Sequence, residues 1–354
     1  MTASTALGQK PALLSQLPQR LREDLPVYAI SSLLLALCLA VLAAKGIFFG
    51  LDGVFANTRF FLLSSAVVLV AGALWHLATV RPDRPLSHLS AHFLADPARR
   101  EVLLGAIPGL ALLCLFMPFF SALKATIPLF ATYDWDRTFI DLERSLLFGH
   151  DAWELLQPVL GYPLITATLA VLYHLWILLC YPGTALFLFL NIDNRLRRRF
   201  LLSFVLTWSL VGGVLATLLA SYGPVFVGAL AGIPDFDPQM AYLRAANEQV
   251  PVMTLVVQDL LLARFHEAES GLGSGISAMP SMHIAMCYLF YLAIRQVDRR
   301  LGWAAMAFGI AIWLGSVHLA YHYALDGVVS VIAVAAIWKG CGWLIDRWDA
   351  RLAA

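Results

Sequence analysis

The sequence predicts an all-α polytopic membrane protein with about eight transmembrane helices. Of its 354 residues, 60% are hydrophobic and only 13% are charged, whereas soluble domains carry about 25% charged residues. The mean hydropathy is +0.76, and the apolar residues gather in runs close to the length of a bilayer crossing, about 20 helical residues. A formal net charge of +1 provides no field that would attract nucleic acid. We therefore expect the bilayer, and no nucleic acid, as a partner.

Eight apolar runs are candidate membrane spans. The sixth is short, because Arg295 follows it closely and its charged end must reach the interface. All five cysteines lie inside the runs, which argues against a disulfide framework or a zinc module. In order, the runs are residues 27–48, 60–80, 102–123, 162–190, 200–220, 281–295, 302–321 and 325–344.

The basic residues predict an orientation. Lys and Arg concentrate at both ends of the chain and in every second connecting segment, which indicates cytoplasmic termini and a multi-pass protein of the cell membrane. Residues 1–25 are polar, and we expect a short amphipathic arm on the membrane surface there. The basic run at 195–199 is expected to set the topology.

Two long segments then fall on the extracytoplasmic side. Residues 124–161 carry acidic and aromatic residues at helical spacing, which predicts helices lying along the interface. Residues 221–280 contain an amphipathic stretch at 239–268 and the glycine-rich residues 271–275. A long loop with its own helices and a glycine hinge is typical of a lid or substrate gate.

The chain is organised around residues 276–326, where two apolar runs are separated by charged residues at 295–300. His283 and His322 are 39 residues apart, and one crossing takes about 20 residues. A chain that crosses the membrane, turns and returns therefore brings His322 back to the level of His283. Both would lie at the extracytoplasmic face.

The residue types in this stretch suit phosphoryl transfer. Asp326 follows His322 by four residues, so on a helix its carboxylate reaches the imidazole, fixes the Nδ1 proton and leaves Nε2 as a nucleophile or base. His283, on a separate helix, is the candidate general acid. Ser277 and Ser281 precede that helix, whose unpaired N–H groups favour an anion. No cofactor is needed for this chemistry.

Other interpretations of these polar residues remain open. His318, His322 and Asp326 recur at i, i+4 and i+8 on one helix face, which also suits a metal site with His283 as a fourth ligand. Alternatively, His318 shapes the pocket or contacts the headgroup. Tyr173, His174 and Trp176 lie mid-span and either line a substrate groove or pack in the core. Three further histidines, in or near the first cytoplasmic loop, are expected to be solvated: His76, His88 and His92.

Two motifs carry a resemblance to a known family. Residues 280–283 read Pro-Ser-Met-His and residues 322–326 read His-Tyr-Ala-Leu-Asp. This pair resembles the second and third motifs of the type 2 phosphatidic acid phosphatase superfamily, and in particular its inositol phosphorylceramide synthase branch.

The resemblance implies roles and a fold. His322 would be the nucleophile, Asp326 its orienting partner, His283 the acid that protonates the leaving alcohol, and Ser281 a phosphate ligand. The implied fold is a six-helix core. Residues 101–354 would form this catalytic membrane domain with the loops 124–161 and 221–280, preceded at 1–100 by the arm and two extra helices.

The sequence departs from the family pattern at its basic residues. The first motif, Lys-x6-Arg-Pro, is missing, and Gly315-Ser316-Val317 stands where the third motif has an arginine. A phosphomonoester dianion needs several cations, whereas a phosphodiester carries a single charge. The departure favours a phosphodiester donor. Residues 221–224 stand where the first motif would be, so Tyr222 is a candidate replacement contact.

The sequence supports several functions. The first is a transferase that moves a phosphoryl-linked headgroup from a phospholipid donor to a lipid alcohol, as in sphingolipid synthesis, through a phosphohistidine. A lipid phosphate phosphatase, with water as the acceptor, is the alternative in the same fold. A metal-dependent membrane hydrolase and a non-catalytic lipid-binding protein are the alternatives from other classes.

Overall fold

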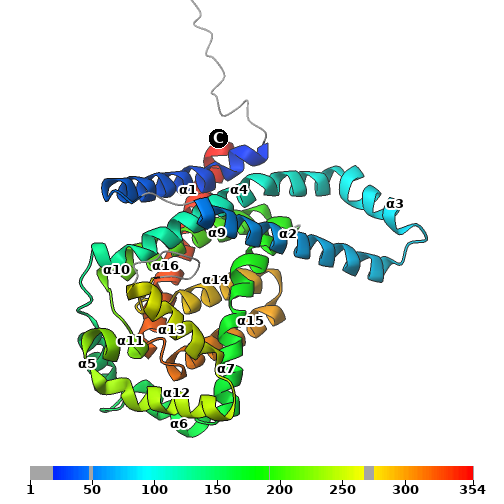
Figure 1. Ribbon diagram of the computed structural model, residues 1–354. Coiled ribbons are helices and arrows are strands. Elements are labelled where there is room, and N and C mark those ends of the chain that lie inside the picture. Colours follow the sequence, from blue (N-terminus) through cyan, green and yellow to red (C-terminus); the bar gives the residue numbers. More distant parts are fainter. Residues whose placement is uncertain (1–18, 48–50, 191, 267–274, 354) are drawn as a thin grey trace, which may run out of the picture.

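The computed structural model describes residues 19–47, 51–190, 192–266 and 275–353, and every regular element in these ranges is a helix (Figure 1). In the first half of the chain the helices are α1 (Gln19–Ala44), α2 (Leu51–Val80), α3 (Pro85–Ser90), the π-helix η2 (Ala91–Ala95), α4 (Pro97–Ala125), the 3₁₀ helix η3 (Ile127–Leu129), α5 (Asp136–Leu146), α6 (Ala152–Leu160), α7 (Pro163–Leu175), the π-helix η4 (Leu179–Gly183) and α8 (Thr184–Phe189).

The second half continues without strands in its described residues. Its helices are α9 (Asn194–Leu206), the π-helix η5 (Thr207–Leu215), α10 (Ala216–Leu218), α11 (Pro224–Ala231), the 3₁₀ helix η6 (Pro234–Phe236), α12 (Asp237–Gln249), α13 (Met253–His266), α14 (Met282–Val297), α15 (Arg299–His318) and α16 (Ala324–Ala353).

Seven helical segments of the described chain are long and apolar enough to cross a membrane. They are α1, most of α2, most of α4, α7 to α8, α9 to α10, α15 and α16. The predicted all-α polytopic fold is confirmed. The short run at 281–295 corresponds to α14, which has 16 residues and buries much of its surface in the protein core. Helix α14 is therefore surrounded mainly by other helices of the protein.

The N-terminal region differs from the predicted arm. Helix α1 begins at Gln19 and continues through Pro26 into the apolar run, so residues 19–25 are the first turns of the first span. Asp24 in these turns is buried against α9, which explains why the polar residues join the bundle. Residues 1–18 of the predicted arm lie outside the described residues.

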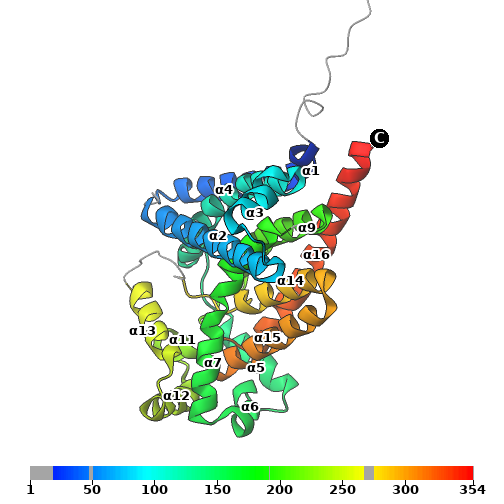
Figure 2. The same ribbon diagram turned by 90° about the vertical axis from the view of Figure 1, so that its right-hand side faces the viewer.

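The molecule has a group of helices at each of its two ends and a third group between them (Figures 1 and 2). Helices α1, α2, α3 and α4 gather at one end, and the short helices α5, α6 and α12 lie at the other. Between them run α7, α14, α15 and α16. The predicted interface helices of 124–161 are therefore α5 and α6. The amphipathic stretch 239–268 contains two helices, α12 and α13, separated at Val250 and Pro251.

The basic run at 195–199 joins three helices. Arg197 donates to Asp24 of α1 at 2.5 Å, and both side chains are 2% exposed. Arg198 donates to Asp349 of α16 and to the carbonyl of Glu23. Arg199 donates to the carbonyl of Trp338. Whatever it does for topology, this run also ties α1 and α16 to α9.

We expect Asp24→Asn to destabilise the protein by about 3–5 kcal/mol, because it leaves the guanidinium of Arg197 buried without its counter-charge. The matched control is Asp346→Asn in the pair with Arg195, whose side chains are 52% and 41% exposed and whose removal costs about 1 kcal/mol or less. Thermal unfolding in detergent measures both. Equal shifts for the two variants would contradict a structural role for the buried pair.

Candidate active site

The helix that leads to His322 ends before it. Helix α15 ends at His318, Ala320 adopts a left-handed conformation with φ of 63°, and α16 begins at Ala324. The predicted continuous helix face with spacing i, i+4 and i+8 is therefore wrong. The turn redirects the chain, so His318 and His322 do not share a helix face.

His322 and Asp326 nevertheless meet. His322 lies two residues before α16 and Asp326 in its first turn, and Nδ1 of the imidazole is 2.9 Å from Oδ2 of the carboxylate. Asp326 is fully buried and His322 nearly so. A carboxylate at this distance holds the proton on Nδ1. This leaves Nε2 with its lone pair available.

His283 faces this pair from α14. Its ring centroid is 6.3 Å from that of His322, and the two rings are tilted by 59° to each other. Tyr173 and Trp176 of the neighbouring span each pack against the His283 ring at 4.1 Å. The Trp176 indole also donates to the carbonyl of His283 at 3.1 Å. Among the mid-span aromatics, these two contact a predicted site residue.

The two serines occupy the approach to α14. Ser281 is the buried N-cap, and its hydroxyl accepts from the N–H of Ile284 at 3.5 Å. Its N–H points to the carbonyl of Asp326 at 3.5 Å, and Ser330 donates to the carbonyls of both Ser281 and Asp326. These bonds link the two motifs directly. Ser277 donates to the carbonyl of Ala216 at 3.3 Å.

His318 and Tyr222 have other neighbours. Nε2 of His318 is 2.9 Å from the hydroxyl of Thr166, which continues the chain of contacts to Tyr242. Tyr222 stacks on Tyr133 at 4.4 Å. Across the described ranges, the single group of three or more His, Cys, Asp or Glu residues with donor atoms close enough to share a metal ion does not include His283, His318, His322 or Asp326. The structure therefore gives no support to the four-ligand metal alternative.

Side chains from distant helices bind the backbone carbonyls at the break between α15 and α16. Gln239 of α12 donates to the carbonyls of Val317 and His318 at 2.7 and 3.1 Å. Gln258 of α13 donates to the carbonyl of Leu319 at 2.9 Å. Both amides are buried. The predicted gate thus includes two helices anchored to the end of α15, while the hinge at 271–274 lies outside the described residues.

Two carboxylates of α5 accept hydrogen bonds from the residues at the start of α16. Their role was not predicted from the sequence. Glu143 accepts from the N–H groups of Ala324 and Leu325 at 2.6 and 3.3 Å. Asp136 accepts from the Tyr323 hydroxyl at 2.8 Å and from two backbone N–H groups. Burial raises the pKa of both carboxyl groups, while these hydrogen bonds oppose the rise.

The buried face of α5 has a recognisable sequence pattern. Asp136, Phe139, Ile140 and Glu143 are spaced by three, four and seven residues, and all four are buried. Buried acids at i and i+7 beside apolar residues indicate a helix face with buried polar partners. The partners themselves could not be found from the pattern.

The sequence model of the PAP2 superfamily matches residues 137–339. The chain belongs to the PAP2 superfamily. Comparisons with curated proteins and with solved structures give no match. Membership supports a phosphatase or phosphotransferase reaction on lipid phosphates. The match begins in α5, so α1 to α4 precede the part of the chain that carries the PAP2 pattern.

One basic residue near this PAP2 site comes from the region before the match. Lys124 is half-buried in the last turn of α4, and a side chain placed at Gly275 would meet the Lys124 carbonyl at 3.0 Å. Cγ of Lys124 would lie 3.2 Å from the same added side chain, so Lys124 lies beside the start of the segment that leads to His283. No carboxylate in the described residues pairs with Lys124. By contrast, Ser316, at the position of the family's arginine, is buried and bonds to the Trp313 carbonyl.

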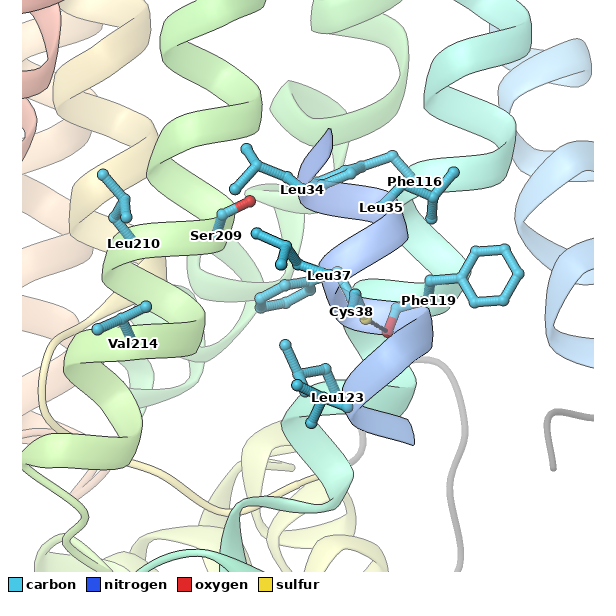
Figure 3. Close-up of a pocket in the computed structure, with 12 residues that line it drawn as sticks. Leu34, Leu35, Leu37, Cys38, Phe116, Phe119, Leu123, Ser209, Leu210 and Val214 are labelled. Atoms are coloured by element: carbon cyan, nitrogen blue, oxygen red, sulfur yellow. Dashed lines mark hydrogen bonds between the residues drawn. The ribbon is translucent and has the colours of Figure 1, made fainter. Parts of the chain in front are cut away.

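An apolar groove of about 170 Å³ lies beside α4 (Figure 3). Side chains of α1, α4 and η5 line it, including Leu37, Phe116 and Val214. Leu123, which precedes Lys124, forms part of its wall. The inner wall, at Phe120, packs edge-on against Trp208 at 4.9 Å. Trp208 also contacts Trp176, which packs on His283, so a chain of packed aromatic rings links the groove wall to His283.

We expect Glu143→Ala to lower turnover by about tenfold or more, because three backbone N–H groups lose a charged acceptor, each contact contributing about 1.5–3 kcal/mol, and the position of His322 is no longer fixed. Asp141→Ala on the same helix is the control, since Asp141 is exposed and pairs only with the exposed Arg137. The measurement is kcat in detergent micelles, together with the melting temperature. Wild-type turnover in the Glu143 variant would refute its positioning role.

Proposed function

We propose that this PAP2 protein is an integral-membrane lipid phosphotransferase, similar to inositol phosphorylceramide synthases, that moves a phosphoryl-linked headgroup to a lipid alcohol through phospho-His322. The observation that carries the proposal is the buried His322–Asp326 pair opposite His283. Helix α4 packs against α8 and η5, and we propose that it completes a six-helix catalytic domain over residues 101–354.

Each proposed step uses one side chain of the site. Nε2 of His322 attacks the phosphorus of the donor, the bond to the leaving alcohol breaks, and His283 gives that oxygen its proton. Asp326 stabilises the positive charge on the phosphohistidine ring. In the second step the acceptor hydroxyl attacks phosphorus, the phosphorus–nitrogen bond breaks, and His283 takes up the hydroxyl proton. His322 and His283 then return to their initial states.

The charge of the site supports a phosphodiester donor. Lys124 lies against Gly275, at the start of the segment that leads to His283, and the arginine position of the third motif is Ser316. One cation balances the single negative charge of a diester, whereas a monoester dianion calls for more. We propose that Lys124 binds a phosphate oxygen and that an acyl chain lies in the groove between α1, α4 and η5. Tyr222, Ser277, Ser281 and His318 remain proposed substrate contacts.

The test of the proposal uses purified protein, a labelled phosphodiester lipid donor, and ceramide or diacylglycerol as acceptor. A transferase forms labelled product lipid that depends on the acceptor, with a higher kcat/KM for the diester than for phosphatidic acid. If the protein releases inorganic phosphate from phosphatidic acid faster and ignores added acceptor, it is a lipid phosphate phosphatase of the same superfamily.

The roles of the two histidines predict different responses to the leaving group. His322→Ala should reduce turnover below detection for every donor, since no other group accepts the phosphoryl. His283→Ala should slow ordinary donors by about 10²–10⁴-fold, but should have much less effect on a donor with a p-nitrophenol leaving group, which needs no protonation. Steady-state rates with both donors check this. Equal losses for the two donors would eliminate the acid role of His283.

Removing the ammonium group of Lys124 should weaken binding of the donor phosphate. A charge-assisted contact is worth about 1.5–3 kcal/mol, so Lys124→Met is expected to lower kcat/KM for the diester donor by about 10–100-fold. The control is Lys45→Met, since the Lys45 ammonium lies over the Phe130 ring at 4.7 Å. Were the two variants to match the wild type, the phosphate contact would have to come from another residue.

We also propose that the site faces the extracytoplasmic side, as the basic residues predict. A cysteine replacing His150, in the exposed turn before α6, should then react with an impermeant thiol reagent in intact cells. A cysteine at Arg300, in the first turn of α15, should react only after permeabilisation. The reverse pattern of labelling would invert the proposed topology.

A further inference from the structure

Three histidines gather on the hairpin between α2 and α4, far along the chain from the PAP2 motifs. His76 lies near the end of α2, His88 in α3, and His92 in the π-helix η2. The hairpin lies beside α2 and α4, well away from α5, α6 and α12 (Figures 1 and 2). The sequence analysis expected solvated histidines here, and nothing in their spacing linked His76 to the other two.

The ring nitrogens of the three side chains converge. One nitrogen from each ring lies within 4.8 Å of the others, and Nε2 of His76 is 3.0 Å from Nε2 of His88. His92 stacks on His76 with ring centroids 3.8 Å apart. All three residues are half-buried, so an ion from solvent can reach their rings.

A hydrogen bond between imidazoles accounts for only part of this cluster. It joins two rings, here His76 and His88, through one proton, and leaves the nitrogens of His92 outside it. A cation instead accepts a lone pair from each of three neutral imidazoles. Tetrahedral Zn²⁺, with bonds of about 2.0–2.1 Å, holds its ligand atoms about 3.3 Å apart. The three nitrogens lie within 4.8 Å of one another, so the rings must move closer together to hold the ion.

We propose that His76, His88 and His92 form a binding site for a divalent transition-metal ion of the zinc class, with water in the remaining position. Imidazole ligands select Zn²⁺, Ni²⁺ or Cu²⁺, whereas Mg²⁺ and Ca²⁺ require oxygen ligands. The ion would fasten the α3–η2 turn to the end of α2. This site is separate from His283 and His322 and takes no part in the proposed phosphoryl transfer.

The experiment measures zinc binding to the full chain in detergent, purified through a tag without histidine and stripped with EDTA. We expect one Zn²⁺ per chain by elemental analysis after gel filtration, no retention of Mg²⁺, and a higher melting temperature with zinc, because an ion that binds only the folded state stabilises it. A wild-type chain that retains no zinc overturns the proposal, whatever the variants do.

The variants assign the ligands. His88→Ala with His92→Ala should abolish stoichiometric binding, and His76→Ala alone should weaken it at least tenfold in a calorimetric titration. His150→Ala is the control, because His150 is an exposed histidine next to Glu154 and its removal should leave zinc binding unchanged. Undiminished binding by the double variant would place the ion elsewhere and refute the site. Melting curves of the metal-free proteins confirm that each variant is folded.

Discussion

Between His318 and Ala324 the chain leaves helical geometry within an apolar helical bundle, and its backbone polar groups must find partners outside the helix. Unpaired N–H and C=O groups in such surroundings each cost several kcal/mol. Gln239 and Gln258 satisfy the carbonyls that end α15, and Glu143 satisfies the N–H groups that begin α16. His322, the proposed nucleophile, lies inside this break. Its position therefore depends on helices that are distant in sequence.

This dependence gives the short helices α5, α12 and α13 a structural role in the candidate site. Helix α5 supplies two buried carboxylates, and α12 and α13 each supply one buried amide. An irregular turn at membrane depth is tolerated only where protein surrounds it. The segments predicted to lie along the interface are thus structural parts of the site.

The helices before the PAP2 match contribute to both ends of the molecule. At one end, Asp24 pairs with Arg197 and joins α1 to α9. Toward the site, Lys124 places a basic side chain beside Gly275, and Leu123 lines a groove together with Val214 of η5, both in the matched region. A PAP2 core that lacks its usual basic motifs would thereby obtain a phosphate contact from a preceding helix. Such an arrangement is consistent with a donor that carries a single negative charge.

The sequence by itself determined the fold class, and it singled out the residues of the proposed site. Runs of about 20 apolar residues specify spans because a bilayer has a fixed thickness, and the spacing of His283 and His322 matches one hairpin across it. The local pattern also placed Asp326 within reach of His322. Only the tertiary structure decided how that contact is made, since nothing in the sequence around Ala320 predicted a left-handed turn. Glu143 and Lys124 joined the site, and His76 met His88, through packing between remote segments. Helical periodicity shows which face of a helix is buried, but the partner of a buried polar group depends on which other helix packs there.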